Sequence, residues 1–208
     1  VKMNNFQKFI AVSRYARWLP DEGRRETWEE TVNRFWDYMT RKFKPLKSQH
    51  ELKRAILNLE VMPSMRLLMT AGEACERDNT CAYNCAYLEI SEPKSFSDLM
   101  FILMNGTGVG FSVENRCTSE LPIVPDIINR DLTETILVND SKEGWADSLH
   151  LLIMRLYDGT HPTWDVSEIR PAGARLKTFG GRASGAGPLE DVFRYVTNIF
   201  YNSKGRRL

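Results

Sequence analysis

The strongest constraint on the fold is a change in sequence character at Met62-Pro63. After this point, short runs rich in β-branched and aromatic residues alternate with amphipathic stretches and glycine-rich turns. These segments span residues 82–90, 96–105, 109–113 and 145–157. Alternating strands and helices are typical of βα units, which assemble into parallel sheets. The sequence therefore predicts an α/β fold for residues 62–208.

Residues 1–61 predict a separate helical region. Apolar residues recur there at helical spacing, from Phe6 through Ile10 and again from Trp28 through Met39. The segment Leu19-Pro20-Asp21-Glu22-Gly23 separates the first helix from the second, and Ser48 is a candidate N-cap for a third. Five aromatic residues of this region are interpreted as helix-packing core, and they are Tyr15, Trp18, Trp28, Phe35 and Trp36.

The composition excludes several functional classes. The 28 Lys and Arg residues balance 27 Asp and Glu residues, so a net charge of +1 gives no field that would attract nucleic acid. The apolar runs are far shorter than the roughly 20 residues that span a bilayer. The N-terminal residues lack the apolar core of a signal peptide. We therefore expect a cytoplasmic protein that binds neither nucleic acid nor a membrane.

The four cysteines, Cys75, Cys81, Cys85 and Cys117, are spaced six, four and thirty-two positions apart. This spacing fits no ordinary zinc site, and the three histidines are scattered, so no metal is expected in this chain. From the residues alone, Cys85 is either a small buried residue of a strand or a thiol that exchanges with a disulfide. The local sequence does not decide between the two.

Two glycine-rich segments are candidate binding sites. The run 105–111 lies between a predicted helix and a predicted strand, the reverse of the order in a dinucleotide-binding turn. It is therefore either a tight turn or a contact with a phosphate or sugar. The segment 177–187 combines glycines with two cations, Lys177 and Arg182, and with the hydroxyls of Thr178 and Ser184. That combination favours binding of a phosphorylated ligand over a plain turn.

The residues Asp140-Ser141-Lys142-Glu143-Gly144 have the pattern of a capping box at a helix start. A purely structural role and a role in ligand binding both remain open for them.

Taken together, the motifs resemble those of class II ribonucleotide reductases, which depend on adenosylcobalamin, and most closely the ribonucleoside-triphosphate reductases, including phage-borne forms. The motifs that carry the resemblance occur in the family's order, and they are Tyr15-Ala16-Arg17-Trp18-Leu19-Pro20, Trp28-Glu29-Glu30-Thr31-Val32, Asn84-Cys85, Gly108-Val109-Gly110-Phe111-Ser112-Val113, Asp140-Ser141-Lys142-Glu143-Gly144-Trp145, Ile169-Arg170-Pro171 and Phe179-Gly180-Gly181-Arg182-Ala183-Ser184-Gly185.

The resemblance implies a helical N-terminal region, 1–61, followed by the first half of a ten-stranded α/β barrel in 62–208. It implies radical chemistry that replaces the ribose 2′-hydroxyl by hydrogen, with Cys85 as the first of two reducing cysteines. Thioredoxin or a glutaredoxin-like dithiol would then reduce their disulfide. By the same resemblance, Asn84, Gly108 and Gly110 line the substrate site.

The resemblance also implies a loop that links a deoxynucleotide effector to the substrate. The residues it assigns to this loop are Lys177, Gly180, Gly181, Arg182 and Ser184, with the helix start at Asp140, Ser141 and Lys142 as further effector candidates.

One part of the family pattern is absent from the sequence. The radical cysteine of the family lies in an Asn-Pro-Cys-x-Glu motif, and this chain has no Asn-Pro dipeptide and no cysteine after Cys117. We therefore expect a second half of the reductase to carry the radical cysteine and most of the adenosylcobalamin site, and this chain alone to be inactive. Two alternatives are a fragment of a class I large subunit and a catalytically dead deoxynucleotide-binding module.

Overall fold

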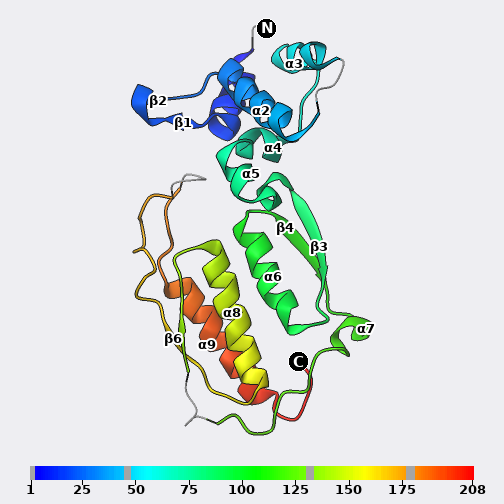
Figure 1. Cartoon of the computed structure of the whole chain (residues 1–208), viewed down its shortest axis with the longest axis vertical. Helices are drawn as coiled ribbons and strands as arrows, with labels where there is room; N and C mark the ends of the chain where they lie inside the picture. Colours follow the sequence, from blue (N-terminus) through cyan, green and yellow to red (C-terminus); the bar gives the residue numbers. More distant parts are fainter. Residues whose placement is uncertain (1–2, 45–47, 130–133, 177–180) are drawn as a thin grey trace. The chain divides into compact units, whose positions relative to one another are not determined.

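The computed structural model describes residues 3–44, 48–129, 134–176 and 181–208 (Figure 1). By compactness the chain divides into two units, Val1–Asn84 and Cys85–Leu208. The boundary between 61 and 62 that the sequence predicts rests on sequence character and stays a prediction. Among the described residues, no helix is both long enough and apolar enough to cross a membrane.

The first unit is mainly helical, and the sequence predicts helices for its residues 1–61. Its helices are α1 (Asn5–Ile10), a π-helical turn (Ala11–Tyr15), η2 (Pro20–Glu22), α2 (Trp28–Lys42), α3 (Gln49–Leu57), α4 (Met65–Thr70), α5 (Glu73–Arg77) and the 3-10 helix η3 (Asn79–Ala82). The segment between the first two predicted helices forms a small antiparallel pair, β1 (Trp18–Leu19) with β2 (Arg24–Arg25), closed by Gly23 at a φ of 62°. That positive φ is one that glycine adopts without steric cost.

Two capping boxes fix helix starts in this unit. At α2, the Thr27 hydroxyl accepts from the Glu30 N–H while the Glu30 carboxylate accepts from the Thr27 N–H. Asn4 and Gln7 make the same exchange at α1. Such reciprocal bonds satisfy N–H groups that a helix leaves unpaired at its N-terminus. At α3, Ser48 occupies the N-cap position as predicted, but its side chain makes no capping bond.

The second unit is built from two parallel strand pairs, each joined through a helix. Strand β3 (Cys85–Glu89) leads through α6 (Pro93–Met104) to β4 (Gly108–Ser112), and β3 pairs with β4 in parallel. After α7 (Asn115–Thr118), strand β5 (Thr135–Leu137) leads through α8 (Lys142–Tyr157) to its parallel partner β6 (Thr163–Asp165). Figure 1 shows β3 and β4 side by side along α6, and α8 beside α9 (Gly187–Asn202).

The α/β class and the parallel pairing are therefore confirmed. The described residues contribute two parallel pairs, fewer strands than a complete half of a ten-stranded barrel would hold.

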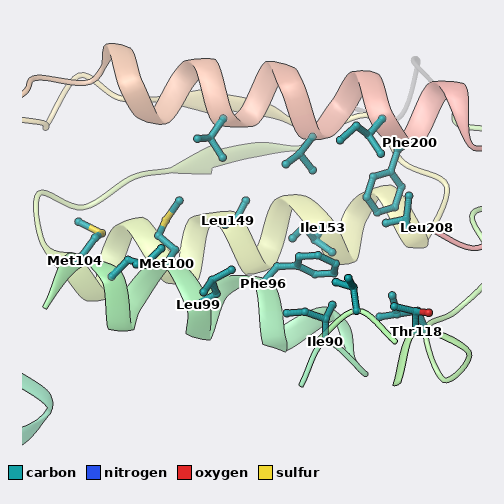
Figure 2. A pocket seen from close by; sticks show the side chains of 16 residues that line it. Ile90, Phe96, Leu99, Met100, Met104, Thr118, Leu149, Ile153, Phe200 and Leu208 are labelled. Atoms are coloured by element: carbon teal, nitrogen blue, oxygen red, sulfur yellow. The ribbon is translucent and has the colours of Figure 1, made fainter. Parts of the chain in front are cut away.

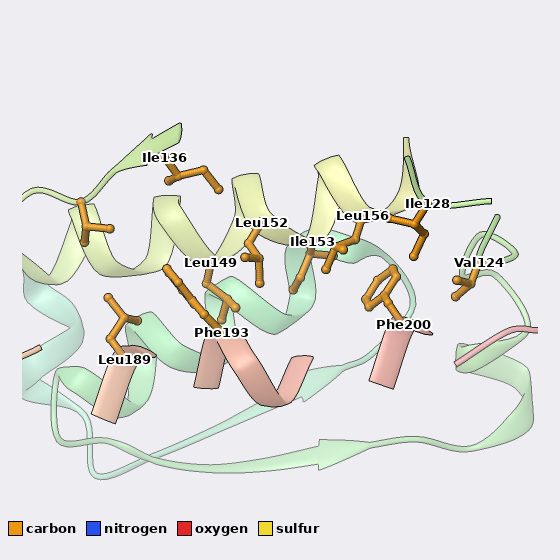
Figure 3. Packing of buried hydrophobic residues seen from close by; sticks show 11 residues of the cluster. Val124, Ile128, Ile136, Leu149, Leu152, Ile153, Leu156, Leu189, Phe193 and Phe200 are labelled. Atoms are coloured by element: carbon orange, nitrogen blue, oxygen red, sulfur yellow. The ribbon is translucent and has the colours of Figure 1, made fainter. Parts of the chain in front are cut away.

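The core of the second unit lies between α8 and α9 (Figure 3). Leu149, Leu152 and Leu156 of α8 and Phe193 and Phe200 of α9 are buried there. Their spacing of three, four or seven residues is the pattern that places side chains on one helix face. Pro188 stands at the start of α9, where its missing N–H costs no helical hydrogen bond.

Candidate functional site

The candidate site is the open face of the β3–β4 pair. Cys85, the first residue of β3, lies opposite Gly108, the first residue of β4. Both are exposed, and Cys85 is the exposed one among the four free cysteines. Because a glycine has no side chain, nothing on Gly108 covers the Cys85 thiol from the neighbouring strand. The structure therefore brings two of the predicted site residues together and rejects the interpretation of Cys85 as a buried strand residue.

The same face continues at the next outward position of each strand. Tyr87 lies opposite Gly110, and alternate residues of a strand point to the same side. Tyr87 is 62% exposed, and a Cβ added to Gly110 would meet no atom within 4 Å. Neither the backbone conformation nor local packing explains a glycine at 110, and a strand glycine often marks a place where another group approaches closely.

Asn84 comes directly before Cys85 and is exposed. It is the last residue of the first compact unit, and Cys85 is the first residue of the second.

The turn that leads into β4 is fixed by Asn105, which caps the C-terminus of α6 and is only 2% exposed. Gly106 follows with a φ of 77°. A tight helix-to-strand turn, one of the two interpretations of this segment, is therefore present. The Lys142 Nζ, at the start of α8, donates to the Asn105 Oδ1 and lies 5.3 Å from the centre of the Phe101 ring. Lys142, a predicted effector residue, thus ties α8 to the end of α6 near the start of β4.

The predicted helix start at Asp140 and Ser141 is present, but it is not a capping box. The Ser141 hydroxyl accepts from the Gly144 N–H at 2.9 Å. Gly144 has no side chain with which to return the bond, so the predicted reciprocal pair cannot form. The Asp140 carboxylate instead accepts from the Arg170 Nε at 2.6 Å, which joins two of the motifs that carried the resemblance.

The predicted effector loop has the backbone pattern of a hairpin in its described part. Arg175 and Arg182 form an antiparallel bridge, and the Ala183 N–H donates to the Ala174 carbonyl at 2.8 Å. The Arg182 Nη1 donates to the Gly173 carbonyl at 2.8 Å, and its side chain is exposed. Lys177 and Gly180 lie outside the described residues.

Two other predicted loop residues have local roles. Gly181 has a φ of 91°, a value that favours glycine. The Ser184 hydroxyl donates to the Gly185 carbonyl at 3.1 Å. Gly185, with a φ of 74°, approaches the Ala172 backbone so closely that a Cβ would lie 3.0 Å from its nitrogen.

Reasoning from the sequence missed two residues of these sites. Tyr87 follows Cys85 by two positions, so strand alternation could have placed it on the same face. Arg170 belongs to one of the motifs that carried the resemblance, but its contact with Asp140 was not predicted. The two residues are thirty positions apart, and no local sequence pattern indicates that they pair.

The described residues contain no group of three or more His, Cys, Asp or Glu side chains that could hold a metal ion. A cavity of about 770 Å³ lies among α6, α8 and α9, and Figure 2 shows side chains such as Phe96, Met100 and Ile153 lining it. Apart from Thr118, the lining residues are apolar.

Comparison with known proteins relates the whole chain to one family. Residues 2–65 match the ribonucleotide reductase alpha domain, and residues 126–200 match the insertion domain of B12-dependent ribonucleotide reductase. The second match contains β5, α8, β6 and most of α9.

Three adenosylcobalamin-dependent ribonucleoside-triphosphate reductases illustrate the relationship. The protein of Lactobacillus helveticus (strain DPC 4571) is 26% identical over an alignment that covers 93% of this chain and 36% of that protein. The protein of Euglena gracilis is 29% identical, with coverages of 98% and 31%. A putative one from Mycobacterium phage D29 is 30% identical, with coverages of 89% and 31%.

A crystal structure of a B12-dependent (class II) ribonucleotide reductase is also similar, with a TM-score of 0.78 and 26% identity over 96% of this chain and 37% of that one. The chain thus spans about a third of the length of the relatives it matches. The resemblance found in the sequence motifs is confirmed: over most of its length the chain is similar to adenosylcobalamin-dependent (class II) ribonucleotide reductases.

Proposed function

We propose that this chain is the part of a ribonucleoside-triphosphate reductase that supplies one of its two reducing thiols, from Cys85. The observation that carries the proposal is the exposed Cys85 opposite the bare backbone of Gly108. A ribose could approach the thiol there without meeting a side chain of β4 at that position.

In the proposed reaction, the ribose loses its 2′-hydroxyl as water and gains a hydrogen. Two thiols supply two electrons and two protons and become a disulfide. One thiol is that of Cys85. The second thiol and the radical cysteine belong to the rest of the reductase, since the other three cysteines of this chain are buried. A dithiol protein of the thioredoxin or glutaredoxin type then reduces the disulfide by exchange, which fits a cytoplasmic location.

Adenosylcobalamin supplies the radical in this proposal, and the cavity among α6, α8 and α9 does not fit as its binding site. A corrinoid carries many amide groups, which lose free energy on burial unless they find hydrogen-bond partners. The cavity among α6, α8 and α9 offers almost entirely apolar walls. We therefore assign the cofactor site to the rest of the reductase.

Asn84, Gly108 and Gly110 are proposed substrate-site residues, and the hairpin with Gly181, Arg182 and Ser184 is proposed to contact a deoxynucleotide effector or the substrate. The assignment of the hairpin is supported by Arg182, whose exposed guanidinium donates a hydrogen bond to the Gly173 carbonyl. Lys142, Asp140 and Ser141 are proposed to contribute indirectly to this site, because their contacts fix the start of α8.

The test is an assay of deoxynucleotide formation by this chain combined with the polypeptide that supplies the remaining reductase sequence, with and without adenosylcobalamin. We expect turnover that depends on the cofactor, no turnover by the chain alone, and loss of turnover in Cys85→Ser. Cys117→Ala is the matched control, because it removes a cysteine of the same unit that is buried.

Turnover that survives Cys85→Ser would refute the assigned role. Turnover that needs a metal-containing subunit instead of adenosylcobalamin would favour the class I alternative. Nucleotide binding without turnover in any combination would favour a binding module.

A further inference from the structure

A second pair of thiols lies in the first unit and is not among the residues assigned to the reductase reaction. The Sγ atoms of Cys75, in α5, and Cys81, in η3, are 3.6 Å apart. Both side chains are buried, with exposed fractions of 1% and 0%. We propose that Cys75 and Cys81 form an oxidisable dithiol that closes into an intrachain disulfide.

The surrounding contacts hold the two sulfurs next to each other. The Cys75 thiol donates to the Thr70 Oγ1 at 3.2 Å, and the Cys81 thiol donates to the Asp78 carbonyl at 3.1 Å. The Tyr38 hydroxyl of α2 donates to the Asn79 Oδ1 at 2.9 Å, which anchors η3 to the helix beside it. A disulfide requires the sulfurs to approach to about 2.05 Å, so closure needs a small local shift.

Metal binding explains the pair less well. Two thiolates supply only half of a tetrahedral zinc site. In the described part of the chain, no third His, Cys, Asp or Glu completes such a group. The remaining explanation is that the two cysteines only fill space in the core, as free cysteines often do.

The chemistry balances with a small-molecule disulfide of the glutathione type as the oxidant. One protein thiolate attacks it, forms a mixed disulfide and releases one small thiol. The second protein thiolate then attacks the protein sulfur of the mixed disulfide and releases the second small thiol. In total the protein loses two hydrogens, and the oxidant is reduced to two thiols.

Burial controls the rate of the first step. Burial raises the pKa of Cys81 to about 11, and the neighbouring Cys75 adds to this effect, so little thiolate exists in the closed structure. The first attack therefore requires a local opening of α5 and η3, which are only five and four residues long. Once one sulfur carries the mixed disulfide, reclosing brings its partner into position.

The sequence provides a sharp test, because Arg77 lies between the two cysteines. Trypsin cleaves after Arg66, Arg77 and Lys94, so Cys75 is on peptide 67–77 and Cys81 on peptide 78–94. Cys85 is also on the second peptide. In a Cys85→Ser chain, therefore, only a Cys75–Cys81 bond can join these two peptides within one molecule. Cys85 is exposed, and the replacement leaves no cavity in the core.

The experiment incubates the folded Cys85→Ser chain with oxidised glutathione, isolates the monomer, alkylates the remaining thiols in denaturant and analyses the tryptic peptides by mass spectrometry. We expect the joined peptides to be two hydrogens lighter than the sum of the reduced pair, and to separate after dithiothreitol. Cys117, which is buried without a cysteine neighbour among the described contacts, should be alkylated throughout.

Recovery of Cys75 and Cys81 fully alkylated after this oxidation would overturn the proposal, as would stable mixed disulfides with glutathione on both residues. A second readout is thermal unfolding of the first unit. The oxidised monomer should unfold at a higher temperature than the reduced one, since the crosslink restricts the unfolded chain. An unchanged unfolding temperature in a sample without the joined peptides would show that no bond has formed, which overturns the proposal.

Discussion

Arg34 of α2 holds the Glu26 carboxylate through both of its oxygens, with Nε 2.8 Å from Oε1 and Nη2 3.0 Å from Oε2. The same guanidinium donates to the carbonyls of Tyr15, Leu68 and Ala71. One side chain therefore joins the π-helical turn, α2 and α4 through its hydrogen bonds.

We predict that Arg34→Ala lowers the free energy of unfolding of the first unit by about 3–5 kcal/mol, because it leaves the buried Glu26 carboxylate without its charged partner. Chemical denaturation followed by tryptophan fluorescence measures the change. Arg41→Ala is the matched control, because it breaks an exposed pair with Glu76 and should change little. Equal losses in the two variants would contradict the structural role of Arg34.

The stability of the first unit should also fall in acid through Glu26. Burial alone would raise the pKa of Glu26, but the hydrogen bonds from Arg34 and from the Arg17 N–H outweigh it and hold the pKa below the usual range. A pKa lowered by folding contributes stability above the unfolded value of about 4.3, and this contribution disappears as the pH falls toward the folded value.

Denaturant midpoints measured between neutral pH and acid should therefore decline more steeply below about pH 4.3 in the native chain than in Glu26→Gln. Glu30 has a pKa lowered to about 2, first by its hydrogen bonds with Arg24, so a Glu30→Gln control separates its contribution. Parallel pH profiles for the native chain and Glu26→Gln would contradict this prediction.

Replacement by alanine should change the stability of the second unit at one glycine and leave it nearly unchanged at another. A Cβ at Gly144 would lie 2.6 Å from the Asn139 carbonyl oxygen, so Gly144→Ala should destabilise the unit by about 1–3 kcal/mol. A Cβ at Gly110 would meet open space, so Gly110→Ala should leave the unfolding midpoint close to that of the native chain. If the open face binds substrate, Gly110→Ala should instead reduce turnover of the complete reductase.

The four cysteines should differ in their reactivity toward a thiol reagent such as 5,5′-dithiobis(2-nitrobenzoic acid). Cys85 is exposed and the other three are buried. We expect one rapidly reacting thiol in the folded chain, while the other three react slowly until denaturant is added. Cys85→Ser should remove the rapid phase. A rapid phase that persists in this variant would contradict the burial of the other cysteines.

Elements with strong local signals could be predicted from the sequence. The runs around β3, α6, β4 and α8 have the periodicities of strands and helices, and the structure places these elements within a few residues of the predicted bounds. Cys85 and Gly108 could be assigned to one site only through the family resemblance. Their pairing itself depends on the parallel register, which no local pattern specifies.

The contacts that were not predicted join residues far apart in the sequence. The Lys142–Asn105 bond links two helices thirty-seven positions apart, and the Arg34 hydrogen bonds to α4 cross a similar distance. A sequence pattern reports the periodicity of one element. It carries no information about which distant carbonyl or amide a long side chain will reach.

The two parallel strand pairs determine the order in which the second unit can form. Strand β4 can pair with β3 only after α6 has brought the chain back, and β6 waits for α8 in the same way. The first unit has no such requirement among its described elements, since its one strand pair is a short hairpin. During synthesis, we therefore expect the helical unit to fold while the ribosome is still adding the strands of the second unit. The second unit, which folds more slowly, then forms after the first unit is complete.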